Sequence, residues 1–133
     1  IGLKDSSSNF DRLTQLRRQC DEKFSLLTGD DDMACEWTLA GGDGVISVTA
    51  NIAPTLMHNM VSAAFAGNRT LAFTLNQKLL HLHAELFCQS NPIPVKWLMA
   101  KLGQIKPELR LPPTWLEPEF ESRVLEAYQH VLQ

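Results

Sequence analysis

Residues 1–9 have the sequence IGLKDSSSN, and this stretch decides how the rest of the chain is interpreted. A short apolar run ends at Lys4 and is followed by polar residues, after which Phe10, Leu13 and Leu16 recur at helical spacing. This order predicts a strand, a loop and a helix. Lys4 then falls at the carboxyl end of a strand, where α/β folds place their catalytic groups. A single lysine is more often a solvated surface charge, so its role depends on the pattern around it.

Two more strand signals follow at intervals of about 20 residues. Residues 24–28 (FSLLT) predict a second strand, and Gly41 and Gly42 end the helix expected after it. Residues 44–49 (GVISVT) are rich in β-branched side chains and predict a third strand, followed by a helix over residues 54–67. Strands and helices that alternate at this spacing are typical of parallel βα units, so the predicted fold class is α/β.

The second half of the chain contains helical patterns only. Leucines recur every three or four residues and predict a helix that runs to about residue 88. Residues 91–94 (NPIP) are expected to break this helix, and a shorter helix and a last helix are expected after them. We therefore divide the chain into an α/β region, residues 1–67, and an all-helical region, residues 68–133.

The three predicted strands are too few for a closed sheet. They would leave two edges unpaired and one apolar face in water. Because a (β/α)8 TIM barrel takes roughly 250 residues, three βα units with a helical region fit the last part of such a barrel. The chain also begins at Ile1, inside a predicted strand and without a methionine. We therefore expect the carboxyl-terminal part of a longer polypeptide, with the amino-terminal half of the barrel missing.

The composition argues against several other classes of protein. The net charge is -3 with acidic and basic residues interspersed, so we expect no binding to nucleic acid or to a membrane surface. No apolar run approaches the roughly 18 residues of a membrane span, and we expect a cytoplasmic protein. Cys20, Cys35 and Cys88 form no CxxC pair, and His81 and His83 fall on different sides of a helix. We therefore expect free thiols, no metal site and no cofactor.

Four motifs give the chain a resemblance to a known family. They are, in order, IGLKDSSSN, LLTGDDD, GGDGVISVTANIAP and SNPIPVKWLMAKLG. With them the chain resembles the carboxyl-terminal half of the dihydrodipicolinate synthases, now called 4-hydroxy-tetrahydrodipicolinate synthases, which are pyruvate-dependent class I aldolases. The resemblance implies a (β/α)8 barrel lyase that condenses pyruvate with L-aspartate 4-semialdehyde in lysine and diaminopimelate biosynthesis. A homo-oligomer is expected.

The resemblance also assigns candidate site residues. Lys4 matches the lysine that forms a Schiff base with pyruvate, a reaction that needs a neutral amine and is favoured by burial. Gly29 and Ile46 match positions whose backbone carbonyls line the pyruvate pocket. Asp30 and Asp31 match an acidic pair near the second substrate, although acidic residues after a strand also commonly cap the next helix. The NPIPVK segment is predicted to be a rigid structural turn.

The resemblance also implies that several groups needed for the reaction are absent from these 133 residues. The resemblance places the proton relay, the arginine that holds the second carboxylate and the lysine feedback site in the first half of the barrel. Tyr128, the only tyrosine, matches none of them, so the chain alone is expected to be inactive. Two alternatives stay open: a non-catalytic half-barrel that pairs with a second copy through its bare edges, and a related aldolase that acts on a sugar acid.

Overall fold

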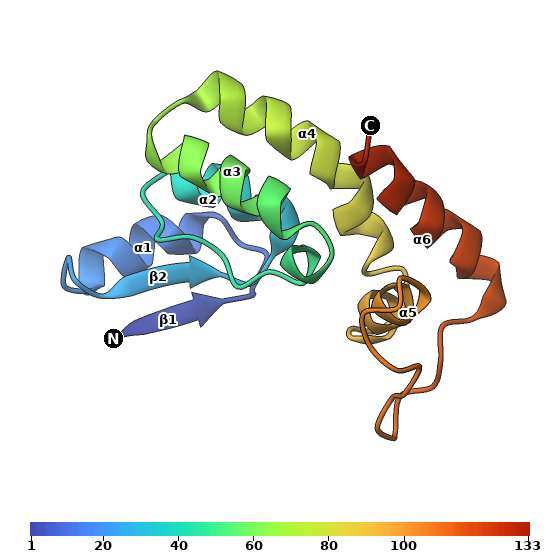
Figure 1. The fold of residues 1–133 in the computed structure, drawn as a ribbon. Helices are drawn as coiled ribbons and strands as arrows, with labels where there is room; N and C mark the ends of the chain where they lie inside the picture. The colour runs from blue at the N-terminus through green and yellow to red at the C-terminus, as the bar shows by residue number, and fades with distance from the viewer.

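The structure, a computed structural model that describes residues 1–133, places a short parallel sheet beside a series of helices (Figure 1). None of these helices combines the length and the apolar character that a membrane crossing requires. The α/β and helical character predicted from the sequence is confirmed. The elements are β1 (Gly2–Asp5), α1 (Asp11–Gln19), β2 (Ser25–Thr28), the 3-10 turn η1 (Asp31–Met33), α2 (Ala34–Leu39), the 3-10 turn η2 (Thr49–Asn51), α3 (Pro54–Phe65), α4 (Arg69–Glu85), α5 (Ile93–Lys101) and α6 (Pro118–Val131).

Strands β1 and β2 form the parallel pair that the sequence predicts. Lys4 lies opposite Leu27 in the register, and Asp5 lies opposite Thr28. Helix α1 connects the two strands, as expected for a βα unit, because parallel neighbours need a crossover connection. The carboxyl ends of both strands therefore lie at the same edge of the sheet.

The third predicted strand, over residues 44–49, is wrong in its extent. Only Val45 pairs with the sheet, in a single parallel bridge to Thr28. The Ser47 hydroxyl accepts a hydrogen bond from the Ala50 amide at 2.8 Å, and the chain turns there into η2. A strand with a neighbour on one side only gains fewer ladder hydrogen bonds, so the local side-chain bond and turn prevail over further extension.

One face of the two strands is covered by helices α1 and α2. Leu26 is buried against Leu13 of α1 and Trp37 of α2. Trp37 Nε1 donates a hydrogen bond to the Leu26 carbonyl oxygen at 2.9 Å, so the polar atom of the indole is satisfied inside the core. A Cβ at Gly42 would overlap the Trp37 ring, which explains glycine at that position. Because side chains alternate along a strand, Lys4 projects from the opposite face.

Helices α2 to α6 share the larger hydrophobic core, to which both predicted regions of the chain contribute. The leucine repeat predicted for α4 is confirmed in the second half of that helix, where Leu79 and Leu82 are fully buried, as is Leu86 just after it. Near its start the same repeat leaves Leu71 at the surface. In Figure 1, α6 lies beside the carboxyl-terminal half of α4, and α5 lies below both. The helical region is thus packed onto α2 and α3 rather than separated from them.

Helix α5 begins earlier than predicted. Residues 91–94 are predicted to break the helix, but α5 already starts at Ile93 and includes Pro94. Proline is compatible with the first turn because the backbone N–H groups there have no partner within the helix. The break lies instead between Leu86, which ends α4, and Pro92, which precedes α5.

A buried polar contact ties α4 to the turn η2. Thr49 Oγ1 and His83 Nδ1 lie 2.7 Å apart, and both side chains are buried. Burial lowers the pKa of His83, and this effect outweighs the attraction of the Asp31 and Asp32 carboxylates, which acts in the opposite direction. His83 is therefore neutral in the folded chain at neutral pH.

We expect the free energy of unfolding to fall as the pH drops below about 6.5, the ordinary pKa of histidine. Below that pH the unfolded chain binds a proton at His83, whereas the folded chain binds it only at lower pH, so acid favours unfolding. His83→Asn retains a group that can bond to Thr49 but does not titrate. Urea unfolding at about pH 7.5 and about pH 5.5 should therefore show a smaller pH effect for His83→Asn than for the unaltered chain.

His58→Asn is the matched control for this prediction, because His58 is exposed on α3 and its hydrogen bond is to the exposed hydroxyl of Ser62 at 3.4 Å. It should keep the pH dependence of the unaltered chain. If His83→Asn keeps that dependence as well, the buried imidazole does not cause it.

Candidate active site

Lys4 lies on β1, and its side chain crosses the first residue after β2. That residue is Gly29, and a Cβ there would overlap both Lys4 Cε and Ser6 Oγ and lie 3.0 Å from Lys4 Nζ. Any larger residue would force the Lys4 and Ser6 side chains to move away from the positions they hold. The sheet itself holds the two residues together, because the Gly29 amide donates a hydrogen bond to the Asp5 carbonyl oxygen at 2.7 Å.

The Lys4 side chain lines a cavity of about 410 Å³. Ile46 and Ser47 line it from the segment after the Val45 bridge, and Asn91 and Lys96 line it from α5 and the residues just before it. A space of this size is within the range of pockets that bind small molecules. The cavity therefore joins the carboxyl-terminal edge of the sheet to the start of α5.

Ile46 follows the bridge residue Val45, and its amide donates to the Thr28 carbonyl oxygen at 2.9 Å. Its side chain is 52% exposed, so it is not part of the core. The structure thus brings together three of the five residues singled out in the sequence. Lys4, Gly29 and Ile46 meet where β1, β2 and the bridge end.

The two aspartates are not among the residues that line the Lys4 cavity, and they line a separate pocket of about 300 Å³. Asp30 Oδ2 accepts a hydrogen bond from the Ser8 amide at 2.9 Å. Asp31 Oδ2 accepts from the amides of Val48 and Thr49 at 2.9 and 3.1 Å. Neither η1 nor α2 has a side-chain cap, so the alternative that this pair caps the next helix is wrong. Asp31 instead holds the start of η2.

Asp5 is a site-shaping residue that the sequence interpretation missed. Its buried carboxylate accepts hydrogen bonds from the Ser7 amide at 2.9 Å and from Arg12 Nε at 2.6 Å. Burial alone would raise the pKa of Asp5, but the hydrogen bonds from Ser7 and Arg12 outweigh it and lower the pKa. The loop after Lys4 is thereby fixed to α1. The available signal was an aspartate followed by serines after a strand, a pattern typical of an Asx turn.

Asn91 and Lys96 line the Lys4 cavity, which the sequence interpretation of NPIPVK as a rigid structural turn did not anticipate. Because α5 starts at Ile93, Lys96 lies on the first turns of a helix rather than in a loop. The sequence signal for Lys96 was the helical spacing of the residues that line the cavity from this segment. Those residues are Pro92, Val95, Lys96 and Met99.

Nearly the whole sequence matches one protein family. The model of the Dihydrodipicolinate synthetase family matches residues 1–131. The chain is 50% identical over 130 residues to the 4-hydroxy-tetrahydrodipicolinate synthase of Thiobacillus denitrificans and 48% identical over 127 residues to that of Methylococcus capsulatus. These matches cover 98% and 96% of this chain but 44% of each relative. The chain therefore spans less than half the length of these curated relatives.

Solved structures agree with the sequence matches. The fold is similar to a dihydrodipicolinate synthase from Acinetobacter baumannii complexed with pyruvate, with a TM-score of 0.94 and 40% identity over 98% of this chain and 45% of that chain. It is also similar to the 4-hydroxy-tetrahydrodipicolinate synthase of Methylacidiphilum fumariolicum SolV, with a TM-score of 0.95 and 31% identity over 99% of this chain and 44% of that one. Since family model, sequence and backbone agree along nearly its entire length, this chain belongs to the dihydrodipicolinate synthetase family.

Proposed function

We propose that this chain forms the carboxyl-terminal part of a 4-hydroxy-tetrahydrodipicolinate synthase, a lyase of lysine and diaminopimelate biosynthesis. In the proposed reaction the neutral amine of Lys4 attacks the ketone carbon of pyruvate, water leaves, and a protonated Schiff base forms. Loss of a methyl proton then gives an enamine, whose terminal carbon attacks the aldehyde of L-aspartate 4-semialdehyde. The observation that carries this proposal is the contact of Lys4 with Gly29, beside Ile46 and an open cavity.

The geometry around Lys4 supports this role in two ways. Gly29 presents no side chain, which lets the Lys4 side chain lie directly against it beside the cavity that Lys4 lines. Asp31 holds the start of η2, and with it the segment that carries Ile46, at a fixed distance from the sheet. We place Asp30 and Asp31 on the side of the second substrate, since Asp31 binds the amide of Val48, a residue that lines the Lys4 cavity.

The remaining part of the site would come from the rest of a barrel. We propose that residues 1–67 are the last three βα units of a (β/α)8 TIM barrel and that residues 68–133 are the helical region after it. In the complete barrel Val45 would pair on both sides and extend into a third strand. The 44% share of the relatives that this chain covers supports this view, because the proton relay implied by the family resemblance lies in the other part.

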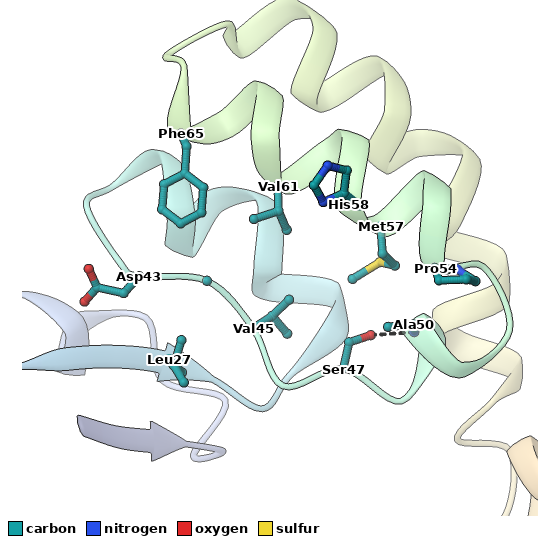
Figure 2. Close-up of a pocket in the computed structure, with 11 residues that line it drawn as sticks. Leu27, Asp43, Val45, Ser47, Ala50, Pro54, Met57, His58, Val61 and Phe65 are labelled. Atoms are coloured by element: carbon teal, nitrogen blue, oxygen red, sulfur yellow. Dashed lines mark hydrogen bonds between the residues drawn. The ribbon is translucent and has the colours of Figure 1, made fainter. Parts of the chain in front are cut away.

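Figure 2 shows an apolar groove of about 320 Å³ beside the Val45 bridge. Leu27 of β2 faces it from the sheet, and Val61 and Phe65 of α3 face it from above. Phe65 is 58% exposed although it is aromatic and lies next to the sheet edge. We propose that this groove is filled by the neighbouring βα unit of the complete barrel. That unit would belong to the part of the relatives that this chain does not cover.

Reduction with borohydride in the presence of pyruvate should add one pyruvate-derived group to Lys4, located by mass spectrometry of proteolytic peptides. Gly29→Ala should lower the yield of this adduct about tenfold or more, because the new methyl group overlaps Lys4 Cε and displaces the amine. Lys4→Arg keeps the positive charge and should abolish the adduct. An adduct of equal yield on another lysine of Lys4→Arg would contradict the proposal.

Sedimentation velocity tests which segment fills the apolar groove. This chain is mixed with the amino-terminal part of the Thiobacillus denitrificans relative. We expect a one-to-one complex that condenses pyruvate with L-aspartate 4-semialdehyde. A stable pair of two copies of this chain that excludes the added part would favour the self-associating half-barrel instead. Turnover of a sugar acid but not of the semialdehyde would favour the related aldolase.

A further inference from the structure

We propose that Ser6 is a further catalytic residue of the Lys4 reaction. Its hydroxyl donates a hydrogen bond to the oxygen of the ketone carbon that the Lys4 amine attacks. This inference rests on the proposed function, because it needs a 2-oxo acid that reacts with Lys4. It adds a side chain from the loop after β1 to the site around Lys4.

The position of Ser6 beside the lysine is the first reason. The two residues are two positions apart at the end of β1, so their side chains point to the same side of the sheet. Lys4 Nζ and Ser6 Oγ both lie within 3.0 Å of the place that a Cβ of Gly29 would occupy. A single ligand oxygen can therefore be next to both atoms. Ser6 does not line the Lys4 cavity, so its hydroxyl meets the oxygen at the reacting carbon while the rest of the ligand lies in the cavity.

The free hydroxyl of Ser6 is the second reason. Of the three serines in this loop, Ser7 donates its hydroxyl to Asp5 Oδ1, and Ser8 donates its hydroxyl to Asp30 Oδ2 at 3.4 Å. Ser6 Oγ forms no hydrogen bond with the rest of the chain, and the residue is exposed. Its proton is therefore available to an acceptor that arrives with the ligand.

The loop that carries Ser6 is fixed on both sides. The Ser7 amide donates to the buried carboxylate of Asp5 at 2.9 Å. The Ser8 amide donates to Asp30 Oδ2 at 2.9 Å, which ties the loop to the residue after Gly29. Because the backbone is held before and after Ser6, the hydroxyl is kept beside the lysine and loses little freedom when a ligand binds.

The addition step of the reaction needs a donor at this place. When Lys4 Nζ bonds to the ketone carbon, one bond of the C=O group breaks and its electron pair moves to the oxygen. A hydrogen bond from Ser6 stabilises the negative charge that develops there. A proton then moves from the nitrogen to the oxygen, and a second proton from the solvent lets the oxygen leave as water, which gives the protonated Schiff base. Ser6 keeps its own proton throughout.

The test compares attack on a ketone with attack on a carbon that carries no oxygen. The chain is incubated with limiting pyruvate and enough cyanoborohydride that reduction does not limit the rate, or with limiting fluorodinitrobenzene. Modification of Lys4 is followed by mass spectrometry of proteolytic peptides. Ser6→Ala should slow the reaction with pyruvate about three- to tenfold, since one hydrogen bond in the addition step is lost. Ser6→Cys should be about as slow, because a thiol of similar size is only a weak donor.

Both variants should keep the rate of Lys4 dinitrophenylation within about twofold of the unaltered chain, because no oxygen anion forms at the attacked carbon in that reaction. Ser25→Ala is the matched control, because Ser25 is also exposed and lies at the other end of the sheet, opposite Gly2. It should react like the unaltered chain with both reagents.

Equal pyruvate rates for Ser6→Ala and the unaltered chain would overturn the assignment of Ser6 and leave the role of Lys4 intact. Equal losses with both reagents would show that Ser6 affects only the placement of the amine and would also overturn it. A Ser6→Cys chain as fast as the unaltered chain would show that the size of the side chain matters rather than its hydrogen bond. If Lys4 is dinitrophenylated but forms no adduct with pyruvate in any variant, the proposed function itself fails.

Discussion

The parallel pairing of β1 with β2 is the constraint on which the site depends. Its register places Lys4 opposite Leu27, and the ladder continues with the bond from the Gly29 amide to the Asp5 carbonyl oxygen at 2.7 Å. This bond sets a residue without a side chain directly against the lysine, where a Cβ would displace the ends of the Lys4 and Ser6 side chains. A shift of the register by one residue would turn Lys4 to the face covered by α1 and α2. The side of the sheet on which the Lys4 amine lies therefore follows from the pairing of β1 with β2.

A second set of contacts joins the sheet to the helices. Asp31 binds the amides of Val48 and Thr49, and Thr49 in turn contacts His83 on α4 at 2.7 Å. These bonds compensate for the short third strand, which gains only the Val45 bridge from the sheet. They hold the segment that lines the Lys4 cavity and couple it to the helical region. Because the contacts are buried and polar, removal of one partner leaves the other without a bond in the core.

The local parts of this arrangement could be predicted from the sequence, and the long-range parts could not. Strand and helix periodicity identified β1, β2 and the buried leucines of α4, and it placed Lys4 at a strand end. The extent of the third strand depends on how many neighbours it has, which periodicity does not report. The bonds of Asp31 to η2 and the position of Lys96 opposite the sheet depend on tertiary packing. The start of α5 at Ile93 was hidden by prolines that also suit a first helical turn.

The most direct measurement is a crystal structure of this chain after reduction with pyruvate and borohydride. We expect a pyruvate-derived group bonded to Lys4 Nζ, lying against Gly29 and Ile46 inside the cavity at the carboxyl-terminal edge of the sheet. A group bonded to a different lysine, or one that extends from Lys4 away from Gly29 and Ile46, would contradict the assignment of this edge as the active site.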